Sequence, residues 1–477
     1  MASNFKYPFP SSFRSCEKSL LDTIKVNWKL NRTAVNEDTD KFAAYLKKKM
    51  GSGTKIHELT AGKDCLTWRV PLHWRVRKAY IARESGEKIV DFNDNALHLW
   101  THSIPIDQVV SREELDKHIL TNPRRPDEIE YHFRNGYRYN VREWGFSIPH
   151  RIVKTMTDAR YRVYIDADLD TKGSIKVVDA VLPGRSKDTI VFMAHTCHPW
   201  TVNDGLSCVA TLVELYKLLQ GQKDRKYTYR FIFGPEYFAA ATFLHLTPRS
   251  EVRKFRYGCF LDMVGTHEPI GMQVSFQGNS LIDRMMKNVL KTHAGTHLIK
   301  SYRKLWPNDE TFYNGPGFAI PTVGFGRGMY REYHHNTDDL ENLDLYHCVE
   351  SLWILSRVVE VFETDFIPKL RYDGPLYLSP YGLYIDPYLD PRGNDAMEFI
   401  QYLMDGKRSC FEIADQLKLD YFFVYNFARQ LVEKRRAKSK PSIPKPESPG
   451  EPLSCSGLFE KPHAKALPFP WDPNDSD

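Results

Sequence analysis

Residues 188–205, DTIVFMAHTCHPWTVNDG, place several metal-binding side chains directly after a run of apolar residues. The run TIVFMA has the length and the β-branched and aromatic content of a buried strand. His195, Cys197, His198 and Asp204 follow in the segment that leaves this strand. A lone histidine in a polar loop is usually structural, so the rest of the chain decides whether this segment forms a site.

Residues 151–370 repeat this order of a strand-like run followed by a helical pattern. Strand-like runs alternate here with longer helical patterns. The runs are TIVFMAH, YRFIFG, RYGCFLDMVG and IPTVGFG, and the helical patterns include LSCVATLVELYKLL and LIDRMMKNVLKTH. Such alternation predicts an α/β fold with a mainly parallel sheet that is flanked by helices on both faces. Ligands of these sheets gather beyond the carboxyl ends of the strands.

The remaining sequence predicts further units around this core. Helical patterns in residues 15–54 belong to the core, whereas residues 55–150 consist of short β-rich pieces and predict an inserted small β domain. Residues 380–436 hold three helical patterns with short separators, the size and rhythm of a winged-helix module. Residues 437–477 are rich in Pro, Ser, Lys and Glu, which predicts a disordered tail.

Composition narrows the class of protein. A chain of 477 residues exceeds the size of one hydrophobic core, which predicts two or three domains. The 66 Lys and Arg residues against 60 Asp and Glu give little reason to expect a polyanion partner. The N-terminus lacks the apolar core of a signal peptide, and no segment is apolar over a membrane span. With eight scattered cysteines, these features predict a cytoplasmic protein without a membrane partner.

Three further strand-to-helix junctions carry residues that bind metals or move protons. Glu236 follows the run FIFGP, Asp262 ends CFLD, and His334 lies in REYHHNTDD before the last core helix. Each acidic residue also has a structural interpretation: Asp204 as a helix cap, Asp262 as an acceptor for turn amides, and Glu236 as a partner of a helix N-terminus. Their shared position at the junctions favours a metal site, and histidines with carboxylates suit zinc.

The order His, Asp, Glu, LDMVG and then YH…D resembles the zinc aminopeptidases with a phosphorylase/hydrolase-like fold. The sequence is still more similar to a bacterial branch of aminopeptidase-like-domain proteins, in which CHP and ND lie a few residues apart. That branch has an inserted β domain and a C-terminal winged helix. The segments WRVPLHW, WGFSIPH, NDETFYNGPG and YHHNTDD resemble its patterns too, so the resemblance covers roughly residues 20 to 435.

The resemblance implies a site with two zinc ions that an aspartate bridges. Asp204 takes the bridging position, Asp262 and one histidine of the opening segment bind one ion, and His334 binds the other. The strand register favours His195 as the histidine of the opening segment, whereas the CHP pattern favours His198.

Two departures from the family pattern bear on the number of metal ions. The family has two adjacent glutamates, a base and a ligand, but here Glu236 is followed by Tyr237. Cys197 stands where an aspartate is usual, and one or two zinc ions are therefore expected. Glu236 takes the position of the general base. Asp309 and Glu310 resemble family positions that face the cleft, and they could hold a substrate ammonium group or supply the missing carboxylate.

These residues predict a zinc-dependent amide hydrolase, an aminopeptidase for a small peptide or peptide-like conjugate. The shortage of carboxylate ligands also fits a single-zinc cyclising enzyme similar to glutaminyl cyclase. A third hypothesis is an inactive core with a winged-helix regulator. Aromatic residues crowd the helix that begins at Tyr421, where a DNA-reading helix needs polar side chains. We therefore expect no specific nucleic-acid partner, and expect this helix to pack on the core or on a second subunit of a homo-oligomer.

Overall fold

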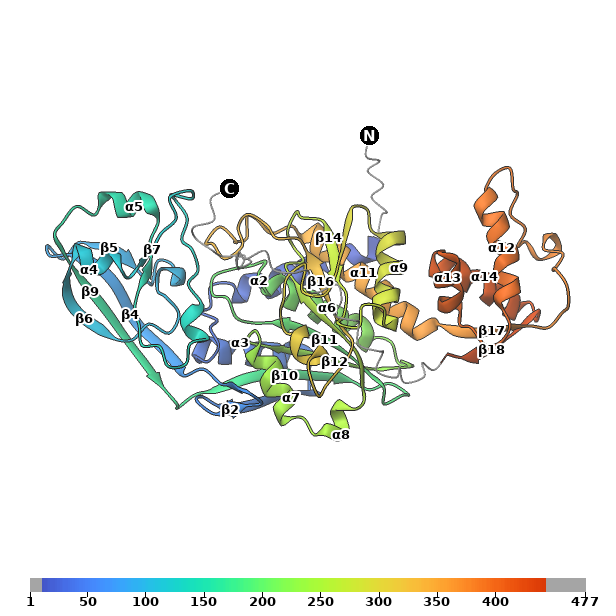
Figure 1. Cartoon of the computed structure of the whole chain (residues 1–477), viewed down its shortest axis with the longest axis horizontal. Helices are drawn as coiled ribbons and strands as arrows, with labels where there is room; N and C mark the ends of the chain where they lie inside the picture. The colour runs from blue at the N-terminus through green and yellow to red at the C-terminus, as the bar shows by residue number, and fades with distance from the viewer. Residues whose placement is uncertain (1–10, 443–477) are drawn as a thin grey trace, which may run out of the picture. The chain divides into compact units, whose positions relative to one another are not determined.

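An eight-stranded sheet forms the centre of the computed structural model, which describes residues 11–442 (Figure 1). The strand order is β1-β10-β12-β11-β13-β16-β14-β15. Strand β11 pairs in parallel with β12 and β13, and β13 pairs in parallel with β16. The bounds are β1 Thr54–Thr60, β10 Ser174–Leu182, β11 Thr189–His195, β12 Thr228–Gly234, β13 Phe255–Asp262, β14 Ile270–Gln273, β15 His297–Lys300 and β16 Thr322–Arg327.

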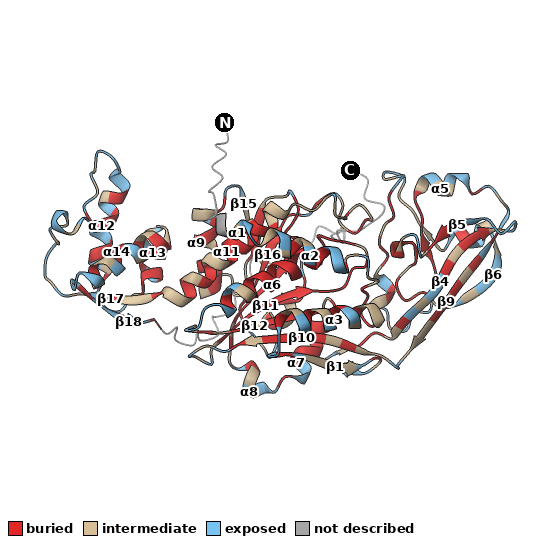
Figure 2. Ribbon diagram, turned by 180° about the vertical axis from the view of Figure 1, so that it is seen from behind, coloured by how far each residue is buried: buried red, intermediate tan, exposed pale blue. Residues whose placement is uncertain are grey.

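Helices cover both faces of this sheet because the central strands are apolar on both sides. All residues of β11 are buried, and the central strands are red in Figure 2. Ile190 and Phe192 pack into one cluster, and Val191 and Met193 pack into the cluster on the other face. The first cluster includes α2 Glu17–Asn27, α3 Glu37–Met50, α6 Leu206–Gln220, α9 Leu281–His293 and α11 Leu345–Thr364, and the second α7 Phe238–Leu246, α8 Arg249–Val252 and α10 Glu310–Asn314. The predicted α/β class is confirmed.

A separate four-stranded sheet, in the order β5-β4-β9-β6, forms the β-rich part of the chain (Figure 1). Its strands are β4 His73–Arg83, β5 Lys88–Asp91, β6 Ile106–Ser111 and β9 Arg160–Asp170. The strand pairing gives the β domain other bounds than the predicted range 55–150. Strand β1 belongs to the central sheet, whereas β9, which follows residue 150, belongs to the four-stranded sheet. The antiparallel ribbon of β4 and β9 carries the chain away from the core and back.

Several short elements complete this half of the chain. They are α1 Ser11–Arg14, β2 Asp64–Cys65, β3 Trp68–Arg69, the 3-10 turn η1 Ala96–His98, α4 Arg112–Asp116, β7 Ile119–Leu120, η2 Arg134–Gly136, β8 Phe146–Ser147 and α5 His150–Thr155.

Three helices follow the core, as predicted, but the winged-helix assignment stays a prediction. They are α12 Pro391–Leu403, α13 Cys410–Leu417 and α14 Tyr421–Glu433, after the turn η3 Ser379–Tyr381. Strand β18, Ala437–Pro441, pairs antiparallel with β17, Phe366–Leu370. The predicted disorder is therefore wrong for residues 437–441, because main-chain pairing orders a strand whatever its polar composition. The rest of the predicted tail, residues 443–477, lies outside the described residues.

The aromatic helix α14 packs against the core of the same chain. Tyr421 and Phe422 are buried, and the Phe422 ring lies 3.3 Å from the guanidinium carbon of Arg357 in α11. The backbone amide of Tyr421 donates to the side-chain oxygen of Asn288 in α9 at 3.1 Å. In the part of the chain that the structure describes, none of the helices is long and apolar enough to cross a membrane.

Candidate metal centre

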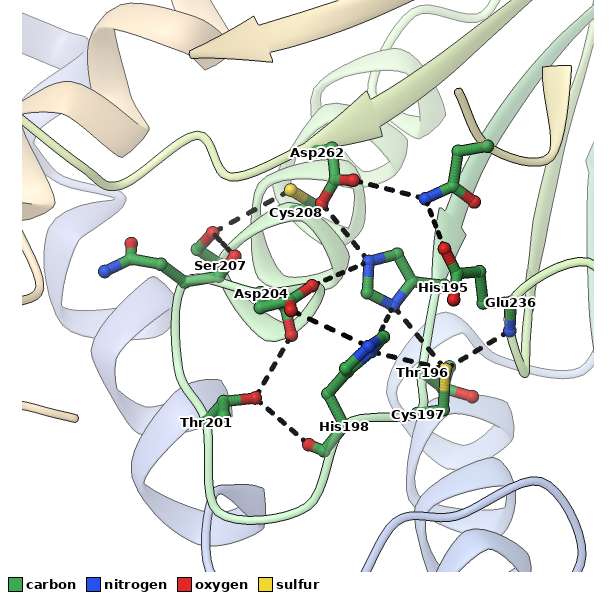
Figure 3. A network of polar contacts seen from close by, with 12 residues as sticks. His195, Thr196, Cys197, His198, Thr201, Asp204, Ser207, Cys208, Glu236 and Asp262 are labelled. Atoms are coloured by element: carbon green, nitrogen blue, oxygen red, sulfur yellow. Dashed lines mark hydrogen bonds and ion pairs between the residues drawn. The ribbon is translucent and has the colours of Figure 1, made fainter. Parts of the chain in front are cut away.

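Two neighbouring parallel strands bring His195 and Asp262 together at their carboxyl ends. His195 is the last residue of β11 and Asp262 the last of β13, and both are buried. The Nε2 atom of His195 lies 3.2 Å from Oδ1 of Asp262 and 3.2 Å from Oδ1 of Asp204 (Figure 3). One imidazole and two carboxylates thus form a compact group at the sheet edge where ligands are expected.

A second group forms on the other oxygen of the Asp204 carboxylate. Its Oδ2 atom lies 3.1 Å from Nε2 of His334 and 3.7 Å from Nε2 of His198. All three side chains are buried. Asp204 is therefore shared, with Oδ1 facing the first group and Oδ2 facing the second. The structure brings both histidines of the opening segment into the site, His195 in the first group and His198 in the second.

The donor atoms and their spacing fit a zinc-type ion. With ligand bonds of about 2.0–2.1 Å, two ligands of a tetrahedral ion lie roughly 3.3–3.4 Å apart. Most of the distances from the Asp204 oxygens to the three imidazoles are close to this value. Oδ2 of Asp204 is buried and accepts no hydrogen bond from the described residues, although imidazole nitrogens lie close by. Ligands around a common cation have this arrangement, so the two groups could hold one or two ions.

The loop before α6 orients the Asp204 carboxylate. Gly205, at the N-cap of α6, has a φ of +90°, and a Cβ atom there would lie 2.6 Å from the His195 ring. No side chain caps α6, so Asp204 does not serve as a helix cap. The Asp338 carboxylate accepts the backbone amides of Asn203 at 2.9 Å and Asp204 at 3.0 Å. Asp338 thereby fixes the direction of the loop.

A buried arginine holds the other half of the same loop. Arg32 donates to the backbone carbonyls of Thr196 at 3.1 Å, His198 at 2.7 Å and Thr201 at 3.0 Å. Burial lowers the pKa of Arg32 to about 10, which still leaves the guanidinium charged near neutral pH. His198 has a φ of +74°, a strained conformation that these hydrogen bonds help to maintain.

Glu236 lies beside the first group, and two side-chain donors hold its carboxylate. The hydroxyl of Tyr137, from the chain segment between β7 and β8, donates to Oε2 at 2.8 Å. The amide of Asn308 donates to Oε1 at 2.9 Å and also to Oδ2 of Asp262 at 3.2 Å. Burial raises the pKa of Glu236 to about 7. The Glu236 carboxylate thus accepts from Tyr137 and Asn308. The N-cap residue of α7 is Tyr237, not Glu236.

Cys197 lies on the far side of the His195 ring. Its Sγ atom is 3.7 Å from Nδ1 of His195 and 3.4 Å from Nδ1 of His198, and it accepts the backbone amide of Glu236 at 3.3 Å. His195, Cys197 and His198 thus form a third close group of metal-capable atoms. Burial raises the pKa of the Cys197 thiol.

Asp309 and Glu310 lie near the site but outside the groups that share Asp204. Asp309 accepts the backbone amide of Tyr237. Glu310 is fully buried and accepts from the side-chain amide of Gln273 at 2.9 Å. Burial raises the pKa of Asp309 to about 7 and that of Glu310 to about 8. Their predicted role as cleft carboxylates stays a prediction.

The segment between β7 and β8 covers the side of the site that carries His334. The Tyr131 amide donates to the backbone carbonyl of His334 at 2.8 Å, and residues 130 and 335 form a β-bridge. The rings of Tyr131 and Phe133 stand 5.6 and 5.0 Å from the His334 ring, and Tyr333 stacks on it at 3.9 Å. Aromatic side chains therefore shape the space in front of the second group.

Sequence reasoning missed four of the residues described above: Arg32, Tyr137, Asn308 and Asp338. Asn308 and Asp338 lie inside segments already singled out, NDETFYNGPG and YHHNTDD. Asn308 was passed over because an asparagine gives no sign of metal binding or proton transfer, and Asp338 because its role as an acceptor of backbone amides is visible only in the fold. Arg32 and Tyr137 are far from the site along the chain, so only the fold reveals them.

Known proteins share this fold. The chain is 28% identical over 373 residues to a Clostridium acetobutylicum protein provisionally named for polysaccharide biosynthesis with an aminopeptidase-like domain; the match covers 77% of this chain and 84% of the relative. A crystal structure from the same organism, described as a candidate peptidase, has a TM-score of 0.79 and 24% identity, covering 90% of this chain and 99% of that one. A zinc aminopeptidase from Bacillus subtilis has a TM-score of 0.56 and 13% identity, covering 74% and 95%.

These relatives confirm the resemblance to aminopeptidase-like-domain proteins. The profile of a family described as a domain of unknown function, DUF4910, matches residues 22–365 and ends before the three C-terminal helices. Because this match spans more than half of the chain, the protein belongs to the DUF4910 family.

Proposed function

We propose that this protein is a zinc-dependent amide hydrolase that removes an N-terminal residue from a small peptide or peptide-like conjugate. One observation carries the proposal: the Asp204 carboxylate lies between two groups of side chains that could bind a metal, and the amide of Asn308 joins Glu236 to one of them. An ordinary polar loop needs neither a shared buried carboxylate nor a carboxyl group held beside it.

The proposed ligands follow from the two groups. His195 and Asp262 would hold one ion, His198 and His334 would hold the other, and Asp204 would contact both. When bound, zinc supplies Lewis-acid activation of the scissile carbonyl and of water. The second group has two imidazoles and only one carboxylate oxygen, which makes it the less negative of the two sites.

Glu236 would act as the proton carrier of the reaction. Its carboxylate takes a proton from the attacking water and later gives one to the leaving amine, as a general base and then a general acid. A pKa of about 7 suits both steps near neutral pH. Tyr137 and Asn308 hold one oxygen each, so the carboxylate has a fixed direction before the substrate enters.

The surroundings of the site support a small substrate. The rings of Tyr131 and Phe133 stand close to the His334 ring and limit the space in front of it. The relative's name joins an aminopeptidase-like domain to polysaccharide biosynthesis, so an amide of an amino sugar is a second substrate class for the same chemistry. The described cysteines are all free thiols, which supports the cytoplasm as the compartment.

A cyclising enzyme similar to glutaminyl cyclases is the second candidate. The groups around Asp204 contain only two carboxylates, Asp204 and Asp262, and Tyr237 stands where the hydrolases of this fold have a further glutamate. With so few carboxylates, the protein would bind a second zinc ion weakly, and the site would then contain a single zinc ion as its Lewis acid. Hydrolysis needs an activated water, whereas cyclisation of an N-terminal glutamine releases ammonia without one.

Metal analysis and product masses test these proposals together. Protein purified without chelator should contain between one and two zinc equivalents, and should cleave aminoacyl amides or p-nitroanilides. His334→Ala should lower both, whereas His245→Ala, which changes an exposed histidine away from the site, should lower neither. Glutaminyl peptides that lose ammonia would establish the cyclase instead. Full turnover by metal-free protein would exclude both proposals.

A further inference from the structure

A second cluster of metal-binding side chains lies apart from the groups that share Asp204. His267 lies in the loop after β13, Asp344 is the N-cap of α11, and His347 lies in the first turn of that helix. Nδ1 of His267 is 3.3 Å from Oδ2 of Asp344, and Nδ1 of His347 is 3.1 Å from the same oxygen. The three ligand atoms all lie within 4.8 Å of one another.

The two oxygens of Asp344 have separate roles. Oδ1 accepts the backbone amides of Tyr346 at 2.8 Å and His347 at 3.4 Å, which is the capping interaction of α11. Oδ2 is the oxygen that faces both imidazoles. The helix cap therefore explains one oxygen of this carboxylate and leaves the position of the other unexplained.

Hydrogen bonding does not account for the imidazole of His347. Its Nδ1 atom is shielded from solvent and forms no hydrogen bond with the described residues, although Oδ2 of Asp344 is only 3.1 Å away. The two atoms are therefore close without being aligned as donor and acceptor. Atoms that surround a common cation are arranged in this way, and the two spacings are close to the roughly 3.3–3.4 Å between ligands of a tetrahedral zinc ion.

We propose that His267, Asp344 and His347 form a second binding site for a divalent transition metal, with two imidazole nitrogens and one carboxylate oxygen as ligands. These donor types suit zinc, nickel or cobalt. The His267 side chain is 74% exposed, so the ion has a path of entry and can keep water as its remaining ligand.

Occupancy of this site would connect two segments that leave the proposed catalytic edge. The backbone amide of Asp344 already donates to the carbonyl of Gly265 at 2.9 Å, in the loop that continues from Asp262. An ion held by His267 and His347 would add a second link between this loop and α11. None of its three ligands belongs to the groups around Asp204, so the proposal does not depend on the proposed function.

Calorimetric titration with zinc chloride tests the site. After chelator treatment, the full-length wild-type protein should bind one more equivalent of zinc than His267→Ala does. If both bind the same number of equivalents, the wild type should bind one of them at least about tenfold more tightly. Asp344→Asn keeps an oxygen for the helix cap and removes the charge, so it should weaken the same equivalent while leaving the fold intact. The control variant His245→Ala should behave as the wild type. Equal stoichiometry and affinity for the wild type and His267→Ala would overturn the proposal.

Anomalous diffraction locates the ion directly. A crystal soaked in zinc chloride, with data collected at the zinc absorption edge, should show a peak between His267, Asp344 and His347. This peak should be absent from a soaked crystal of His267→Ala, whereas peaks near Asp204 should remain. Peaks confined to the Asp204 groups in the wild-type crystal would refute the second site even if the titration shows an additional equivalent.

Discussion

Replacing Glu236 with glutamine separates proton transfer from every other role of this side chain. Glutamine keeps an oxygen for the Asn308 amide, which donates to Oε1 of Glu236 at 2.9 Å. Its new NH2 group faces the Tyr137 hydroxyl, which now donates at 2.8 Å but can turn to accept instead. No polar group is left without a partner, so the free energy of unfolding should change by no more than about 1 kcal/mol.

The expected loss is therefore almost wholly catalytic. General-base catalysis contributes about 10²–10⁴-fold to the rate, and glutamine has no basicity. At about 1.36 kcal/mol for each factor of ten, the barrier should rise by roughly 2.7–5.4 kcal/mol. Glu236 belongs to neither group of ligands around Asp204, so the metal content should be unchanged. A fall in kcat at constant zinc content is the expected signature.

Three measurements on the same preparation check this prediction. They are kcat on an aminoacyl p-nitroanilide, zinc content by elemental analysis, and the free energy of unfolding from urea denaturation. Glu113→Gln, at an exposed position in the β domain, serves as the matched control. A variant that keeps more than about a third of the wild-type kcat would refute the base role. A variant that loses zinc would make Glu236 a ligand instead.

Three further predictions follow, two from contacts around the same edge and one from helix α14. Tyr137→Phe removes a hydrogen bond that favours the charged form of Glu236, so the pKa of this carboxyl should rise and the acidic limb of the kcat/KM profile should move to higher pH. Asp338→Asn keeps one acceptor oxygen but turns an NH2 group toward the other backbone donors of the Asp204 loop, so at least one buried amide loses its acceptor. Zinc affinity, measured by competition with a chelating dye, should fall about 10–100-fold. Duplex DNA titrated at near-physiological salt should give no sequence-preferring complex, because aromatic residues occupy the first turns of α14.

The sequence predicts well which residues meet at this edge of the sheet, because a strand end is a local feature with a fixed place in the fold. His195 and Asp262 each follow a run of buried apolar residues, and parallel strands place their carboxyl ends on one edge. The distance between them along the chain does not matter once β11 and β13 are neighbours. Local pattern and sheet direction together were enough to identify the edge.

Residues that hold the ligands in place were beyond such reasoning. Arg32 lies before α3 and acts on backbone carbonyls of the 196–201 loop, which any residue type provides. The contact with Arg32 requires no particular side chain in that loop, so no sequence pattern indicates it. Tyr137 comes from the long segment between β7 and β8, which has little regular structure, and its hydroxyl reaches Glu236 only because that segment pairs with residues 334–336.

The choice between His195 and His198 could not be made from the sequence because both histidines are at the site. The strand ends at His195, which fixes that imidazole beside Asp262, and the chain then turns through the positive φ of His198. This turn places the second imidazole beside the first, with the two Nδ1 atoms 3.3 Å apart, and brings its Nε2 atom toward Oδ2 of Asp204, near His334. A carboxylate has two oxygens that point apart, so one aspartate after the turn can face both histidines. Strand register and the CHP pattern therefore each indicated a residue of the candidate site.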